Sequence, residues 1–211
     1  MALIVIGGHS RNVGKTSVVA GLIAALPEYY WTAMKITQYG HGVCSLNGQP
    51  CHCATDDHTW AISEEKDRSG ESDTSRFLLA GAARVWWVRT EQGRLAEAMP
   101  TIRRRLAESK NVIVESNSIL KFVRPELYLT VLDPQNADFK KSAQEFLDRA
   151  DAVIVHQPES DAKTRVEKPA WQAVSLKPIA GRPMFPVHPP QYLSSEMVEF
   201  VRSKLEVTSL R

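Results

Sequence analysis

The chain has little of what would mark a protein for a membrane, for export or for a nucleic acid. Its 211 residues carry a net charge of only +2, which is too small to argue for a nucleic-acid partner. No apolar run approaches the roughly 20 residues that span a bilayer. The three cysteines, clustered in one stretch, are too few for a disulfide framework. We therefore expect neither nucleic-acid binding nor membrane association.

The N-terminal stretch MALIVIGG lacks the basic segment of an export signal and runs directly into a glycine-rich sequence. We interpret it as a first strand, and a cytoplasmic location follows by default. Hydrophobic residues make up 43% of the chain and charged residues 24%, as in ordinary globular proteins. The length predicts one domain, residues 1–211, with a Cys/His-rich insert at about 40–60 and a C-terminal extension at about 158–211.

Short apolar runs alternate with helix-like stretches along the chain. Strands are expected at residues 2–6, 31–36, 83–89, 111–115, 127–132 and 152–155. Helices are expected at residues 15–26, 73–81, 93–108, 138–149 and 194–205, and the polar residues 37–71 are expected to form a long loop. Strands alternating with helices predict an α/β fold of three layers, with a mostly parallel central sheet and helices on both faces.

The stretch GGHSRNVGKTS lies between the first strand and the first helix. A glycine-rich turn at this place exposes backbone N–H groups that, with the positive end of the helix, bind phosphate oxygens. Lys15 would reach the β- and γ-phosphates of a nucleoside triphosphate, and Thr16 would hold Mg²⁺. The candidate phosphate-binding residues are Gly8, Asn12, Val13, Gly14, Lys15, Thr16 and Ser17. The pattern predicts a P-loop NTPase fold; the alternative is a coincidental Gly-Lys-Thr at a helix N-terminus.

The spacing of this motif is unusual. The common pattern G-x-x-x-x-G-K-[ST] would place a glycine at position 9, where this chain has His9, and the nearest glycine is Gly8. Dethiobiotin synthetase is a family with five residues between that glycine and Gly-Lys-Thr. Its loop is similar to GHSRNVGKT, including the valine before Gly-Lys-Thr.

The resemblance implies further site residues. Lys35, in AMKITQYG, resembles that family's lysine after strand two, which can neutralise transferring phosphoryl oxygens. Asp73, in GESDTSRFLLAGA, resembles an aspartate that helps to position Mg²⁺. Glu115, in NVIVESNS, resembles the family's Val-Glu-Gly and ends a strand where α/β sheets bind ligands. The implied catalytic residues are Lys15, Lys35 and Glu115, and the implied Mg²⁺ ligands are Thr16, Asp73 and Glu115. The alternatives are a surface lysine and a carboxylate that merely ends its strand.

A second family fits the middle of the chain. The segment DTSRFLLAGAARVWWV resembles a region of the MobB-type proteins, GTP-binding accessory proteins of molybdopterin guanine dinucleotide biosynthesis. The resemblance covers roughly residues 3–116 and implies GTP or ATP, a cofactor-biosynthesis partner protein and a homodimer. The chain departs from the pattern at Ser116, where the relatives have glycine, and has no good N-K-x-D guanine signature. The choice between GTP and ATP therefore stays open.

All three cysteines lie in the stretch HGVCSLNGQPCHCATDDH. Thiolates and imidazoles suit Zn²⁺ or an iron–sulfur cluster. The candidate ligands are Cys44, Cys51 and Cys53 with His41 or His58. Their spacing lacks the usual C-x-x-C knuckle, and the alternative is three reduced thiols in a loop.

The leading hypothesis is a Mg²⁺-dependent nucleoside triphosphate-binding protein, a slow NTPase with a MobB-like accessory role in molybdenum cofactor biosynthesis. One alternative is an ATP-dependent ligase or kinase similar to dethiobiotin synthetase. Another is a nucleotide-switched metal-binding protein whose cargo site is the Cys/His insert.

Overall fold

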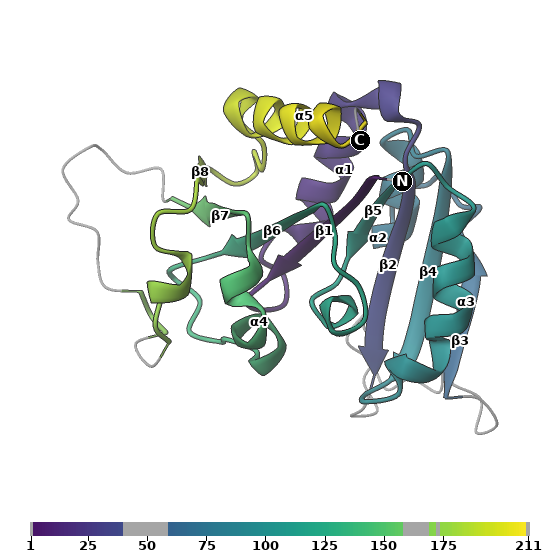
Figure 1. Cartoon of the computed structure of the whole chain (residues 1–211), viewed down its shortest axis with the longest axis horizontal. Coiled ribbons are helices and arrows are strands. Elements are labelled where there is room, and N and C mark those ends of the chain that lie inside the picture. The colour runs from purple at the N-terminus through teal and green to yellow at the C-terminus, as the bar shows by residue number, and fades with distance from the viewer. Residues whose placement is uncertain (1, 40–58, 158–168, 172–173, 210–211) are drawn as a thin grey trace.

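The computed structural model describes residues 2–39, 59–157, 169–171 and 174–209, which form an eight-stranded sheet with helices on both faces (Figure 1). The strand order is β3-β4-β2-β5-β1-β6-β7-β8, and only the β3–β4 pairing is antiparallel. The strands are β1 Ala2–Gly8, β2 Thr32–Tyr39, β3 Trp60–Glu64, β4 Arg84–Glu91, β5 Asn111–Glu115, β6 Leu127–Leu132, β7 Ala152–His156 and β8 Met184–Val187.

Five α-helices and several short 3₁₀ turns connect the described strands. The helices are α1 Lys15–Ala25, α2 Asp73–Leu79, α3 Leu95–Ala107, α4 Lys141–Glu145 and α5 Ser195–Ser209. The 3₁₀ turns are η1 Pro27–Tyr29, η2 Ser118–Lys121, η3 Leu147–Arg149 and η4 Lys177–Ile179. Helices α1, α2 and α5 pack on one face of the sheet, and α3, η2 and η3 on the other. The expected α/β fold of three layers is therefore confirmed.

Strand β1 shows why the central strands read as unbroken apolar runs. Its alternate side chains point to opposite faces. Ile4 and Ile6 enter the core under α1, while Leu3 and Val5 enter the core under α3. Because both faces are covered, every position of the strand is buried.

Three stretches differ from the sequence-based expectation, and one of them is β8, where no strand was expected. Residues 37–71 are not one loop, because β2 continues to Tyr39 and β3 pairs with β4 at the edge of the sheet. Every residue of β3 is only half-buried, so this strand has no apolar run to reveal it. The helix expected at 138–149 is also wrong: it is reduced to α4 and η3, since residues 138–140 instead contact the loop after β1.

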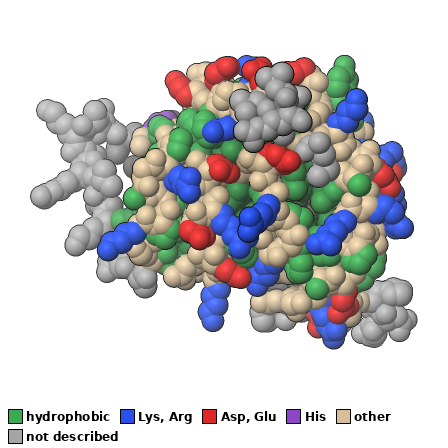
Figure 2. All heavy atoms as spheres, viewed as in Figure 1, with side chains coloured by type: hydrophobic (Ala, Val, Ile, Leu, Met, Phe, Trp, Pro, Cys, Tyr) green, Lys and Arg blue, Asp and Glu red, His purple; other side chains and the backbone are tan. Residues whose placement is uncertain are grey.

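The C-terminal extension completes the fold. Strand β8 lies parallel to β7, and α5 buries Met197, Val201 and Leu205 in the same core as α1. The amphipathic helix expected near the C-terminus is confirmed. In the part of the chain that the structure describes, no helix is long and apolar enough to cross a membrane. Acidic and basic side chains are interspersed over the face shown in Figure 2.

Parallel strands bring residues distant in sequence to one edge of the sheet. Glu115, the last residue of β5, lies opposite Ile6 of β1 and opposite Lys35 of β2. The loop from β1 to α1 leaves from this same edge. Ligands bind at the carboxyl ends of strands in open α/β sheets, so the candidate site is expected here.

Candidate functional site

The loop between β1 and α1 has the backbone of an anion-binding turn. Gly14 precedes α1 in the left-handed region, at φ 81°, and Asn12 also has a positive φ of 57°. A Cβ on Gly14 would lie 2.0 Å from the ring of Tyr192, so only glycine fits this position. The free N–H groups at the start of α1 then face the space above the loop. The chain therefore has a strand, a glycine turn and a helix in succession, as the sequence predicted.

Asn117 forms hydrogen bonds with Gly8, the last residue of the strand that leads into this loop. The Gly8 N–H donates to Asn117 Oδ1 at 2.9 Å, and Asn117 Nδ2 donates to the Gly8 carbonyl at 2.8 Å. A Cβ on Gly7 would lie 2.2 Å from Asn117 Oδ1. Sequence reasoning missed Asn117, because an asparagine after a strand is an ordinary loop residue and nothing local links it to a glycine 109 positions away.

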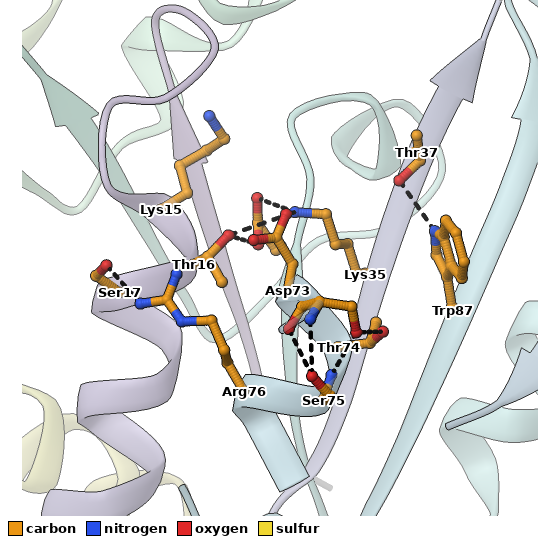
Figure 3. Close-up of polar contacts among 12 residues, drawn as sticks. Lys15, Thr16, Ser17, Lys35, Thr37, Asp73, Thr74, Ser75, Arg76 and Trp87 are labelled. Carbon is orange, nitrogen blue, oxygen red and sulfur yellow. Dashed lines mark hydrogen bonds and ion pairs between the residues drawn. The ribbon is translucent and has the colours of Figure 1, made fainter. Parts of the chain in front are cut away.

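Lys15 lies folded back over the loop. Its Nζ donates to the Ser10 carbonyl at 2.7 Å and points away from the neighbouring Lys35 (Figure 3). Burial lowers the pKa of Lys15 from 10.5 to about 8, and the charge of Glu115 opposes this shift only in part. The negative charge near the Lys15 ammonium is therefore too small to offset its burial, as expected of a phosphate-binding lysine before its ligand arrives.

A second polar group joins β2, β5, α1 and α2 beside the loop (Figure 3). Lys35 Nζ donates to Asp73 Oδ2 at 2.5 Å and to Glu115 Oε1 at 2.9 Å. The Thr16 hydroxyl donates to Glu115 Oε2 at 2.8 Å, and Lys35 Nζ lies 3.4 Å from that hydroxyl. The four residues therefore form one connected group. Lys35 sits in mid-strand, since β2 runs on to Tyr39, and not at the strand end that the sequence suggested.

This group pairs one ammonium with two carboxylate groups. Burial alone would lower the pKa of Lys35, but the carboxylates of Glu115 and Asp73 together raise it above its usual value. Glu115 is only 5% exposed, so its charge depends on the ammonium beside it. The two carboxylates thus form a position that stabilises a cation, and Lys35 occupies it.

The same oxygens suit Mg²⁺. The hydroxyl of Thr16 and the carboxylates of Asp73 and Glu115 are hard oxygen ligands, and the Lys35 ammonium stands in for a cation between the two carboxylates. Among the residues that the structure describes, no group of three or more His, Cys, Asp or Glu could hold a metal by itself. Mg²⁺ held here would take its remaining ligands from phosphate oxygens and water.

Asp73 is the first residue of helix α2, and a cap fixes the start of this helix. Ser72 caps the helix by accepting from the Ser75 N–H at 3.0 Å, and the Ser75 hydroxyl accepts in turn from the Ser72 N–H at 2.9 Å. Glu65 accepts from the Thr74 hydroxyl at 2.6 Å. A capping box normally has Glu or Gln at its third helical position. Because serine stands there instead, this cap has only a weak signature in the sequence, and the contact of Glu65 has none.

Helices α1 and α2 are also joined directly. Arg76 of α2 donates to the Ser17 hydroxyl of α1 at 3.1 Å (Figure 3). Ser17 is thus bonded to protein, while Val13 is buried with 1% exposure inside the loop. These two candidate residues shape the loop through their side chains, and only their backbone groups face a ligand position.

His9, where the common motif has glycine, anchors the loop to β6 and the segment after it. The ring accepts at Nε2 from the Asp133 N–H at 3.0 Å, so the proton lies on Nδ1, which donates to the Asp138 carbonyl at 2.7 Å. The backbone N–H of His9 donates to the Val131 carbonyl, and its own carbonyl accepts from the Lys140 N–H. Burial lowers the pKa of His9 and favours this neutral form.

The Cys/His site stays a prediction. Cys44, Cys51, Cys53, His41 and His58 all lie outside the described residues. The proposed Zn²⁺ or iron–sulfur cluster therefore has no structural description.

Comparisons with known proteins give distant structural neighbours only. No protein-family model matches the chain, and the search of curated proteins gave no match. The "apo" form of LpxK from Aquifex aeolicus in complex with ATP is 17% identical over 88% of this chain and 53% of that one, with a TM-score of 0.44. HypB from Helicobacter pylori in complex with nickel is 15% identical over 97% of this chain and 88% of that one, with a TM-score of 0.49. The chain thus spans about half the length of that LpxK.

The Lys35 group should contribute strongly to stability. Lys35→Met leaves buried Glu115 without its counter-ion, and breaking a buried pair in this way costs about 3 kcal/mol of unfolding free energy. Chemical denaturation would measure the change. The matched control is Lys66→Met, which removes an exposed partner of Glu64 and should change stability little. Equal effects of the two substitutions would contradict the buried pairing.

Proposed function

We propose that this protein binds a Mg²⁺-bound nucleoside triphosphate at the loop between β1 and α1 and hydrolyses it slowly. The observation that carries the proposal is the Lys35, Asp73, Glu115 and Thr16 group beside that loop, a cation position between two carboxylates directly next to the glycine turn. Phosphoryl transfer needs positioned phosphates and charge stabilisation more than covalent chemistry. The chain offers both at one edge of its sheet.

Each residue has a distinct part in this proposal. The Lys15 ammonium would leave the Ser10 carbonyl and donate its hydrogen bond to phosphate oxygens instead. Thr16, Asp73 and Glu115 would hold Mg²⁺, which when bound neutralises charge on the phosphates. Lys35 would then be released from the two carboxylates and donate to phosphoryl oxygens at the transfer position. Glu115, freed of Lys35, would also orient water near the site.

The finer proposal is a MobB-like accessory role in molybdenum cofactor biosynthesis, as a homodimer with a cofactor-biosynthesis partner protein. Its support is the resemblance of the segment 73–88, in which Asp73 now proves to contact Lys35. A metal-carrying role would rest on the Cys/His insert, which lies outside the described residues.

The direct test is a thermal-shift panel of ATP, GTP and their diphosphates, with and without Mg²⁺. A ligand at 100 times its Kd stabilises the folded state by about 2.7 kcal/mol, so the base that binds gives the larger shift. Lys15→Ala should abolish the shift while the fold survives. Lys66→Ala, an exposed lysine 77% accessible, should leave it unchanged. An unaltered shift in Lys15→Ala would refute binding at this loop.

Nucleotide affinity should fall as the pH rises above 8. The pKa of Lys15 is about 8 in the free protein, and bound phosphate raises it by favouring the charged form. Affinity is therefore fully present below pH 8 and drops by up to about tenfold for each pH unit above it. Titration calorimetry between pH 7 and 9.5 would measure the trend. Lys15→Arg, which keeps its charge, should show a flat profile over this range.

A second candidate, a kinase or ligase with an organic acceptor, is favoured by the sheet face next to Lys35. Trp87 of β4 pairs with Lys35 and donates through Nε1 to the Thr37 hydroxyl at 3.1 Å (Figure 3). The Arg89 guanidinium lies 4.5 Å from the Trp87 ring centroid and donates to the Ser63 hydroxyl at 3.3 Å. Within the described ranges Arg89 has no carboxylate partner, and its Nε is buried without a hydrogen bond. A small organic acid would fit beside this guanidinium.

This candidate predicts acceptor-dependent turnover. A panel of small carboxylic acids would be screened for stimulation of ATP or GTP hydrolysis. Arg89→Lys should raise the KM for a stimulating acid about tenfold or more and leave acceptor-free hydrolysis unchanged, because only the bidentate contact is lost. Arg104→Lys, at an exposed position of α3, is the matched control. Failure of every acid to stimulate turnover would remove the candidate.

A further inference from the structure

The segment from Asp133 to Lys140 closes on the phosphate-binding loop from the side of β6, the strand next to β1 (Figure 1). Its backbone holds the His9 ring at both nitrogens, at 3.0 Å and 2.7 Å. Asn136 Nδ2 donates to the Ser10 hydroxyl at 2.8 Å, and the Lys140 N–H donates to the His9 carbonyl at 2.8 Å. The two segments therefore form one unit, although about 125 residues separate them in the sequence.

Lys140 occupies the end of this segment, immediately before α4. Its backbone is extended, at φ −64° and ψ 139°, and its side chain is half-buried. Burial lowers the pKa of Lys140, and the positive charge of Arg11 in the loop lowers it further, while Asp138 and Glu115 oppose the shift. The bond from its backbone N–H to the His9 carbonyl places the Cα of Lys140 beside the loop, within the length of a lysine side chain.

Three cationic side chains belong to the loop and to the segment bonded to it, namely Arg11, Lys15 and Lys140. In the described part of the chain none of Lys15, Lys140 and Arg11 forms an ion pair, and the carboxylates of the site are already bonded to Lys35. Like charges gathered at a turn of free N–H groups repel one another until an anion binds between them.

We infer that Lys140 is a further phosphate-binding residue of the nucleotide site and that His9 is the positioning residue that holds it there. The inference rests on the proposed function, since it assigns a residue to the same phosphate site. It also gives position 9 a role. A glycine there would keep the backbone bond to Lys140 but lose the two ring bonds, which the His9 nitrogens make to Asp133 and Asp138.

The test compares two neighbouring lysines. Lys140→Met keeps the apolar stem and removes the charge, and Lys141→Met does the same at an exposed position next to it. Calorimetric titration with Mg·ATP and Mg·GTP should show about tenfold weaker binding for Lys140→Met, as expected for a lost charged hydrogen bond, and no change for Lys141→Met. A merely structural role of the side chain would leave the affinity of Lys140→Met unchanged, because that substitution keeps the apolar stem.

The role of His9 is tested by rescue. Gln can donate and accept as the neutral imidazole does, so His9→Gln should keep most of the affinity, while His9→Ala should lose as much as Lys140→Met. In the Lys140→Met background, His9→Ala should weaken binding little further, because the two residues act as a unit. Additive losses would overturn the positioning role. The Lys140→Met and Lys141→Met pair still tests Lys140 if His9→Ala does not fold.

The outcomes separate this inference from the proposed function. Absence of nucleotide binding by the unaltered protein would overturn both. Binding that Lys15→Ala abolishes, but that Lys140→Met and Lys141→Met leave equal, would overturn the role of Lys140 alone.

Discussion

The site depends on one ammonium group held between two carboxylates. Lys35 bonds to Asp73 and Glu115, and Glu115 bonds in turn to Thr16. These contacts tie β2, β5, α1 and α2 together at the carboxyl edge of the sheet. A carboxylate as deeply buried as Glu115 is tolerated only with a cation beside it, so Lys35 stabilises the fold. In the proposed function, Mg²⁺ would take the place of the lysine between the two carboxylates.

The phosphate-binding loop is fixed from three directions by residues distant in sequence. Asn117 bonds both backbone groups of Gly8, Tyr192 packs on Gly14, and His9 joins the loop to β6 and the segment that follows it. The loop is therefore shaped before any ligand arrives, and its N–H groups need little rearrangement to meet an anion. Lys35, paired with its two carboxylates, lies on the side of β2, and Lys140 lies on the side of α4. The proposed binding of a nucleotide would use both lysines.

Much of the fold could be predicted because its signals are local. The apolar runs of β1, β5, β6 and β7 follow from burial on both faces, and α1 ends before Pro27 as its sequence indicated. The grouping of Lys35, Asp73 and Glu115 was implied by family resemblance and by the common edge of parallel strands. Strand β3 was missed because an edge strand with half-buried side chains leaves no apolar pattern. Residues 138–140 were predicted as helix, because their composition does not indicate that they contact the loop after β1.

The sequence by itself indicated the central strands, most of the helices, the glycine-rich turn and the residue types available for phosphate and Mg²⁺. Only the tertiary structure decided what His9, Asn117, Tyr192 and Lys140 contact. The reason is physical: each of these contacts is made across roughly 110 to 180 residues of chain, and local patterns of polarity carry no information about such partners. The histidine that breaks the common motif is therefore an anchor for a distant segment, and its neighbours in space give it that role.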